Sequence, residues 1–172
     1  MKRFLSVREL TLYAFLGAGL FAAKLAMAQL PNIEPVTLLV MLFAVCFGWK
    51  SLCAVAVYAA LEFFLWGAGL WAVCYLYIWL VPFLLARAAR RVDSPLWWAA
   101  LSGAFGLLFG ALCAPVYWVA GGWAAALSWW AAGIPMDLLH GAGNFFLALV
   151  LFRPMRRWLS ALARRYGLPG AA

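Results

Sequence analysis

Residues 10–29 read Leu-Thr-Leu-Tyr-Ala-Phe-Leu-Gly-Ala-Gly-Leu-Phe-Ala-Ala-Lys-Leu-Ala-Met-Ala-Gln, an apolar run that contains one charged side chain, Lys24. A helix that crosses the hydrocarbon core of a bilayer needs about 20 predominantly apolar residues. The run closes at Leu30-Pro31, where proline disfavours further helix. This stretch therefore predicts a membrane-spanning helix.

Further apolar segments follow the first one, and six segments in all are candidates for spanning helices. We predict helices over residues 10–29, 35–48, 51–66, 70–86, 95–119 and 135–152. Two of their starts carry a helix-start signal: proline at Pro35, and a cap followed by proline at Ser94-Pro95. The predicted fold class is an all-α membrane protein, a compact bundle of six transmembrane helices in one domain over residues 1–172.

An apolar stretch at 121–133 lies between the last two segments and holds Trp123, Trp129 and Trp130. It is too short to cross a bilayer alone. It is an interfacial piece, a re-entrant piece or an extension of the last helix, and the sequence leaves these three placements open.

The composition excludes most soluble classes of protein. Of the 172 residues, 69% are hydrophobic and 10% are charged, whereas an ordinary soluble domain is about 45–50% apolar and about 25% charged. A water-soluble globule of this size cannot hide so much apolar surface. A soluble enzyme, a nucleic-acid-binding domain and a disordered tail are thereby excluded.

The net charge of +8 is distributed as in a chain that spans a bilayer. The basic clusters fall between the apolar segments: Lys2, Arg3 and Arg8; Lys50; Arg87, Arg90 and Arg91; and Arg153, Arg156, Arg157, Arg164 and Arg165. With six spans all of these fall on one side, and the opposite connections hold no Lys or Arg. By the positive-inside rule, we predict a multi-pass protein of the prokaryotic cytoplasmic membrane (the cell membrane) with both termini cytoplasmic.

Few charged side chains lie within the apolar segments, because each costs at least about 2.5–3.5 kcal/mol at the centre of a bilayer. Lys24 and Glu62 belong to the first and third segments, both toward the outer half. They either form a buried ion pair with each other or face a water-accessible cavity and bind a polar substrate. Glu34, between Pro31 and Pro35, either closes over a pocket or caps the second helix.

A polar stripe is predicted on the last segment. At about 100° per residue, Asp137, His140 and Asn144 share one face of a helix. Two interpretations stay open: a buried hydrogen-bond network that holds helices together, and a set of ligand contacts. A metal site is not predicted, because no second His or Cys cluster completes the ligands that Asp137 and His140 offer.

Aromatic residues gather in the outer half of the later segments. The candidates for stacking on a flat ring ligand are Trp71, Tyr75, Trp118 and Trp129. The alternative for each is an ordinary interfacial aromatic belt. Pro115 and Pro135 also fall toward the outside, where carbonyl groups freed by proline need a cover of protein or of water. We therefore expect an outward-facing cavity among helices four to six.

Small residues mark one face of the first segment, where Ala14, Ala18 and Ala22 recur every four residues. This spacing permits the close approach of another helix, and Lys24 points more than about 100° away from Ala18 and Ala22. One face of this helix is thus predicted to dock a partner while another faces the interior of the protein.

Together these features resemble the substrate-binding (S) subunits of energy-coupling factor (ECF) transporters for vitamins, and the resemblance covers nearly the whole chain. Beyond the six short helices and the alanine spacing, it is carried by two stretches of sequence. These are Leu-Pro-Asn-Ile-Glu-Pro-Val at 30–36 and Ala-Gly-Ile-Pro-Met-Asp-Leu-Leu-His at 132–140 followed by Asn144. No motif diagnostic of riboflavin, thiamine, biotin or folate binding is present, so the cargo stays open.

The resemblance implies a non-enzymatic protein that captures a vitamin or a vitamin precursor from outside and binds no cofactor itself. Such subunits associate with a transmembrane scaffold (T) subunit, here through Ala14, Ala18 and Ala22, and with two ATPase subunits that use ATP. They topple in the membrane to release their cargo inside. The implied pocket lies mainly among helices four to six, under the loop between the first two helices. The residues expected to contact the ligand are Lys24, Asn32, Glu34, Glu62, Trp71, Tyr75, Trp118, Trp129, Asp137, His140 and Asn144.

Two other functions stay open. A structural six-helix membrane scaffold of the MreD type needs no polar outer pocket, and in it Asp137 and His140 would serve stability alone. An intramembrane enzyme would use the same two residues, although no complete catalytic constellation accompanies them.

Overall fold

The computed structural model describes residues 5–168, and every regular element within that range is helical. The elements are α1 (Val7–Ala26), α2 (Val36–Phe47), the 3₁₀ turn η1 (Trp49–Ser51), α3 (Leu52–Trp66), α4 (Leu70–Cys74), α5 (Leu80–Ala88), α6 (Pro95–Leu107) and α7 (Phe109–Arg165). The predicted all-α class is confirmed. Lys2 and Arg3, which belong to the first predicted basic cluster, lie outside the described residues.

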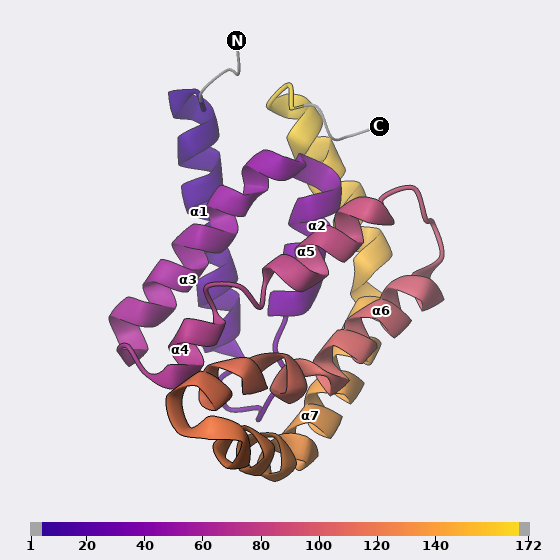
Figure 1. The fold of residues 1–172 in the computed structure, drawn as a ribbon. Coiled ribbons are helices and arrows are strands. Elements are labelled where there is room, and N and C mark those ends of the chain that lie inside the picture. The colour runs from indigo at the N-terminus through magenta and orange to yellow at the C-terminus, as the bar shows by residue number, and fades with distance from the viewer. Residues whose placement is uncertain (1–4, 169–172) are drawn as a thin grey trace.

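The helices run between two opposite ends of the molecule (Figure 1). The start of α1, the connection from α2 to α3, the loop from α5 to α6 and the end of α7 share one end, which we call the basic end. The loop at 27–35 and the kinked part of α7 lie at the opposite end, which we call the far end. The basic clusters at Lys50, at Arg87–Arg91 and after Arg153 therefore gather at one end of the molecule, in keeping with the predicted charge asymmetry.

Within residues 5–168, three stretches of helix are long and apolar enough to cross a membrane: Val7–Ala26, Trp49–Trp66 and the kinked Pro95–Arg165. The helix Val36–Phe47 is also apolar but shorter. These helices are compatible with a membrane protein. The number of spans and the side on which each terminus lies stay predictions.

The centre of the molecule is α2, in which all twelve residues are buried. A helix that is apolar on every side is stable only when other elements surround it, and α1, α5, α6 and α7 pack around this one. The single polar side chain on α2 is Thr37, whose hydroxyl accepts a hydrogen bond of 3.0 Å from the Asn144 amide of α7. The predicted segment 35–48 corresponds closely to α2.

The first helix begins three residues earlier than the apolar run. The Ser6 hydroxyl accepts from the backbone N–H of Glu9, and the Glu9 carboxylate accepts from the backbone N–H of Ser6, so the two residues form a capping box. The inward face of α1 packs on α3, where Gly17 lies so close to Ala54 and Val57 that no side chain fits. The alanines at 14, 18 and 22 are exposed on the outer face, as the spacing predicts.

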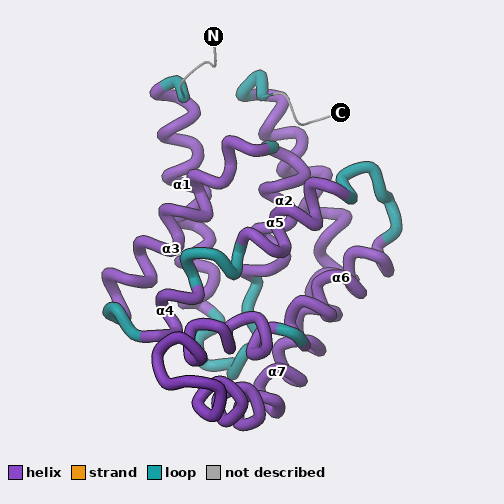
Figure 2. The backbone as a smooth tube through the Cα atoms, in the orientation of Figure 1, coloured by secondary structure: helices purple, strands orange, loops and turns teal. Residues whose placement is uncertain are grey.

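The predicted helix 70–86 is not continuous, because α4 ends at Cys74 and α5 begins at Leu80 (Figure 2). Pro82 is the third residue of α5, a position whose amide has no acceptor within the helix. Proline is therefore compatible with the first turn of a short helix but not with the interior of a long one. The turns between the two helices place Tyr75 and Trp79 in the core.

The predicted helix 95–119 is also divided, since α6 ends at Leu107 and α7 begins at Phe109. At this break the backbone N–H of Gly110 donates to both carboxylate oxygens of Asp137, each at 3.1 Å. In an uninterrupted helix the same N–H would donate to the carbonyl of Gly106. Asp137 therefore caps the start of the new helix from 27 positions away in the sequence.

The last helix is much longer than the predicted segment 135–152. It is interrupted at Gly122, where φ is 76° and ψ is −177°, a backbone conformation open essentially to glycine alone. From residue 123 it continues to Arg165 with Pro135 and Pro154 inside it. Of the three placements left open for 121–133, the structure has the extension of the last helix.

Candidate functional site

A cluster of charged and aromatic side chains is centred on Lys24, near the end of α1. Its members, which we call the lysine cluster, are Lys24, Glu34, Tyr58, Glu62, Trp71 and Tyr75. They come from α1, the 27–35 loop, α3, α4 and the turn after α4. Segments that are distant in sequence are thus brought to one place by the packing of α1 on α3 and of α3 on α4.

The Lys24 ammonium donates hydrogen bonds to the Glu62 carboxylate at 2.7 Å and to the Tyr75 hydroxyl at 3.1 Å. A second carboxylate, that of Glu34, lies 3.9 Å from the same ammonium. The Glu62 side chain is fully buried, and the Lys24 side chain is 20% exposed. The ion pair between the first and third segments, one of the two predicted alternatives, is therefore present; a role of the pair in ligand binding stays a prediction.

Aromatic rings surround the Lys24 ammonium. Its nitrogen lies 5.1 Å from the ring centroid of Tyr75 and 5.9 Å from those of Tyr58 and Trp71. Cations are attracted to the faces of aromatic rings within about 6 Å, so the rings stabilise the charge that the helix carries into the apolar interior. Trp71 and Tyr75 also contact each other edge to face, with ring centroids 5.0 Å apart.

The lysine cluster holds more carboxylates than cations. Glu34 and Glu62 both approach Lys24, while the second oxygen of Glu62 and the hydroxyl of Tyr58 have no hydrogen-bond partner within the described residues. In the loop outside the helices, burial raises the pKa of Glu34, and the Glu62 charge raises it further while Lys24 lowers it. The cluster can therefore accept a proton, a bound cation or a hydrogen-bond donor.

A cavity of about 310 Å³ opens beside the lysine cluster at the far end. Its lining comes from the last turn of α1, the following loop and Trp66 at the end of α3, and includes the polar side chains of Lys24, Asn32 and Glu34. This cavity lies between α1, the 27–35 loop and α3, and not among the predicted helices four to six, where an outward-facing cavity is expected.

The 27–35 loop is fastened to α7 on the other side of this cavity. The Asn32 amide donates to the carbonyl of Met136 at 3.1 Å, and Asn32 has a φ of 54°, in the left-handed region that asparagine tolerates. Ile33 lies against Gly143 so closely that a methyl group at Gly143 would contact it at 3.2 Å. One side-chain hydrogen bond and one close apolar contact thus hold the loop against α7.

The polar stripe on α7 is buried and largely occupied by contacts within the protein. Asp137 is engaged with Gly110, and Asn144 donates to Thr37. His140 packs against Phe105 and Phe109, with ring centroids 6.4 Å and 5.0 Å away, and its Nε2 has no partner among residues 5–168. The contacts of Asp137 and Asn144 match the predicted network that holds helices together. Within the described residues, His140 Nε2 and Asn144 Oδ1 are buried without a hydrogen-bond partner.

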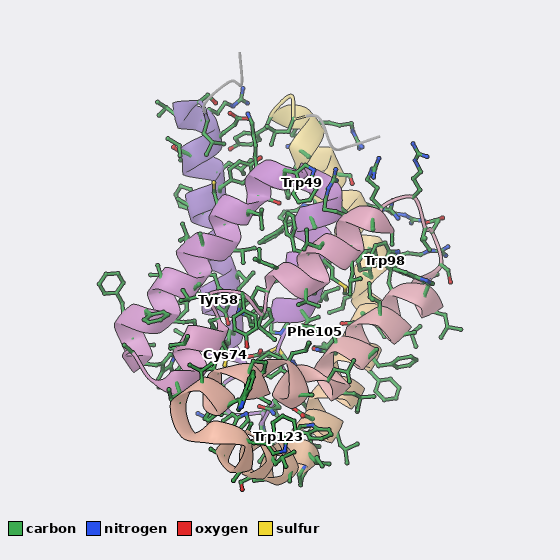
Figure 3. All side chains as sticks on the ribbon, in the orientation of Figure 1. Trp49, Tyr58, Cys74, Trp98, Phe105 and Trp123 are labelled. Atoms are coloured by element: carbon green, nitrogen blue, oxygen red, sulfur yellow. The ribbon has the colours of Figure 1, made fainter. Side chains whose placement is uncertain are left out.

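Rings that sequence reasoning missed connect the lysine cluster to His140. Trp79 lies 5.2 Å from Tyr75 and 6.0 Å from Phe109, measured between ring centroids. Figure 3 shows Tyr58 and Phe105 within the interior and Trp123 at the far end. Tyr58 could have been identified, since it precedes Glu62 by four residues and so shares its helix face. Trp79 carries the same signal, since it follows Tyr75 by four residues and the predicted helix 70–86 places both on one face.

Trp118 and Trp129 are not brought to the lysine cluster. Trp118 is 56% exposed and Trp129 39% exposed. Trp129 stacks on Tyr117 instead, with the ring centroids 3.9 Å apart and an interplanar angle of 11°. Of the predicted stacking set, the structure therefore unites Trp71 and Tyr75 and leaves the other two on the surface of the kinked region.

Among residues 5–168, no group of three or more His, Cys, Asp or Glu side chains is placed to hold a metal ion. Comparison of the chain with family models, with curated proteins and with solved structures finds no match.

Proposed function

We infer that the chain is a membrane-embedded substrate-binding protein, of the kind that serves as the S subunit of an ECF-type importer. The observation that carries this proposal is the lysine cluster beside its cavity at the far end. Burying two carboxylates, one ammonium and several unpartnered polar atoms costs stability. A purely structural membrane protein does not require the lysine cluster, whereas a protein that binds a polar ligand within the membrane does.

The chemistry of the cluster indicates the kind of small molecule that fits it. Trp71 and Tyr75 offer ring faces and edges to an aromatic or heterocyclic ligand. Glu34 and Glu62 accept hydrogen bonds, and Lys24 and Asn32 donate them. A vitamin or vitamin precursor with a flat ring and amino or hydroxyl substituents has matching groups, and it would enter from outside through the cavity under the 27–35 loop.

Delivery requires other subunits. The chain has no glycine-rich phosphate loop, so ATP would be used by two ATPase subunits, joined through a transmembrane scaffold subunit. Ala14, Ala18 and Ala22 are exposed on α1, on the side away from the α3 contact, and this flat face suits close helix docking. Toppling of the chain against the scaffold would then carry the ligand to the inside.

The test is ligand binding to the full chain in detergent. We expect one compound from a panel of vitamins and their precursors to quench tryptophan fluorescence with saturation. Replacing Trp71 by Phe should reduce the quenching, whereas Trp158→Phe, which changes an exposed tryptophan at the basic end, should not. If no compound in a broad panel binds, or if both variants lose the signal equally, the proposal fails.

A structural scaffold of the MreD type is the second candidate, and a specific observation favours it. The carboxylate of Asp137 and the amide of Asn144 bond to other parts of the protein, and Lys24 already has a partner in Glu62. These polar groups are thus engaged within the protein, as in a scaffold that binds no ligand. The two candidates differ in the ligand: a scaffold shows no saturable binding and co-purifies with cell-shape proteins instead of ATPases.

A further inference from the structure

A second cavity, of about 400 Å³, lies at the basic end, remote from the lysine cluster. We call it the arginine pocket, and its lining residues are Asp93, Arg153, Arg156, Arg157, Ser160 and Arg164. All but Asp93 belong to the last turns of α7, and Asp93 belongs to the loop between α5 and α6. The proposed transport function makes no use of this pocket.

The arginine pocket has a strong excess of positive charge. Four guanidinium groups face one carboxylate, and that carboxylate is 81% exposed, so solvent weakens its neutralising effect. The sequence offers no further compensation, because the chain contains no Asp or Glu after Asp137. Like charges spaced by three or four residues on a helix repel one another, and an additional anion would relieve this repulsion.

Two of the arginines build the wall of the pocket. Arg153 donates to the carbonyl of Asp93 at 2.8 Å, and Arg156 donates to the carbonyls of Val92 and Arg90 at 3.0 and 2.9 Å. These hydrogen bonds fix the loop from α5 to α6 against α7. The opening of the pocket is therefore a defined part of the fold.

The other two arginines are free to bind a ligand. Within residues 5–168, Arg157 and Arg164 form no ion pair, and their side chains donate no hydrogen bond to the protein. At about 100° per residue they lie within roughly 20° of each other around the helix, with Ser160 between them. A guanidinium group binds the oxygens of a phosphate through two parallel hydrogen bonds. The two residues lie two turns apart on one face of α7, about 10.5 Å along the axis, so their long side chains can converge on one phosphate group between them.

Exposed tryptophans indicate where the arginine pocket lies relative to the lipid bilayer. Trp158, next to Arg157, is 66% exposed, and Trp97 at the start of α6 is 37% exposed. Tryptophan side chains in this setting lie at the level of the lipid headgroups. We propose that the arginine pocket binds the phosphate of an anionic phospholipid headgroup in the leaflet at the basic end.

The test uses the full chain in detergent and native mass spectrometry with dioctanoyl phosphatidylglycerol as the probe. The variant Arg157→Gln/Arg164→Gln should lower the affinity by at least about tenfold, because two charge-assisted hydrogen bonds are lost. The matched control is Arg90→Gln/Arg91→Gln, which removes two charges at the same end but outside the lining. It should change the affinity less than about twofold, in line with the small effect of exposed charges.

Three outcomes would overturn the proposal. Equal losses in the two double variants would mean that general positive charge attracts the lipid. Equal affinity for dioctanoyl phosphatidylcholine would mean that the anionic headgroup is not recognised. Displacement of the bound probe by inorganic phosphate at far lower concentrations than the lipid itself would assign the pocket to a soluble anion.

Discussion

Lys24 illustrates how one residue can be both stabilised and constrained by its surroundings. The ammonium lies between Glu62 and Glu34 and against three aromatic rings. Each of these neighbours attracts the ammonium charge, and together they compensate for the loss of water around it. The site is therefore expected to respond to the removal of either partner in the pair far more than to the removal of both.

We predict this response for the Lys24–Glu62 pair. Lys24→Met should lower the free energy of unfolding by on the order of 3 kcal/mol, because it leaves the buried Glu62 carboxylate without its cation. Glu62→Leu should lower it less, because Glu34 still lies 3.9 Å from the Lys24 ammonium. The double variant should recover most of this loss, since an apolar pair suits the interior. Chemical denaturation of the wild-type protein, the two single variants and the double variant gives the four free energies of unfolding for this double-mutant cycle. A double variant as unstable as the two single effects added together would show that the pair is not coupled.

At the scale of single residues, much of the lysine cluster was accessible from the sequence. Lys24 and Glu62 are conspicuous because charge is costly inside apolar segments, and Glu34 because it lies between two prolines in the connection after the first segment. The cap that Asp137 provides for Gly110 was not accessible, because its partner is a backbone N–H and no side chain marks it. Trp118 and Trp129 were grouped with Trp71 by depth alone, and depth does not fix the direction in which a ring points.

At the scale of elements, the crossing of α6 and α7 depends on the absence of side chains. A methyl group placed on Gly106 would lie 2.7 Å from the backbone nitrogen of Gly141 and 2.8 Å from its Cα. Gly103 is almost as close to the same turn of α7. The two helices therefore approach at backbone distance, which is how glycine holds helices together in membranes.

Gly106→Ala should separate these helices. We predict a loss of about 1–3 kcal/mol in the free energy of unfolding, typical of overpacking where backbone must move. The control is Gly19→Ala on α1, where an added methyl meets nothing within 4 Å. That change should be neutral or stabilising by up to about 1 kcal/mol, since alanine favours helix over glycine. Thermal unfolding of both variants in the same detergent decides the matter, and equal effects would contradict the close crossing.

The positions of the helices follow from the sequence better than their interruptions do. The segments 35–48 and 51–66 match α2 and α3 within about a residue, because their ends carry glycine and proline. The break at Leu108 has a tertiary cause, the capture of the Gly110 amide by Asp137. The break at 75–79 is marked locally by Pro82, and only the burial of Tyr75 and Trp79 that accompanies it is tertiary. Apolar periodicity contains no record of such contacts.

In the whole molecule, the fold places the arginine-rich surface and the lysine cluster toward opposite ends. Arginines gather at the basic end, and the lysine cluster with its cavity lies toward the far end. Charge placement alone predicted this polarity, since the positive-inside rule needs only the order of loops and segments. The bend at Gly122 and the long continuous helix after it were not predictable, because the apolar stretch 121–133 suits several placements equally well.

This polarity predicts which loops are reached from each side of a membrane. In intact cells, a membrane-impermeant thiol reagent should label Gln29→Cys in the far-end loop. It should label Ser94→Cys in the α5–α6 loop only after the cells are opened. The unchanged chain is the control, because three of its four cysteines are buried. Labelling of both positions from the same side would contradict the arrangement of the helices across the bilayer.

The enclosure of α2 has a consequence for biogenesis. Its twelve residues span only about 18 Å, short of the roughly 30 Å of a hydrocarbon core, and its cover comes in large part from α5, α6 and α7, which the ribosome makes later. The nascent chain must therefore hold this helix in a provisional location until synthesis is nearly complete. A truncated chain that lacks α5, α6 and α7 would leave α2 without its cover, and we expect membrane proteases to degrade such a chain.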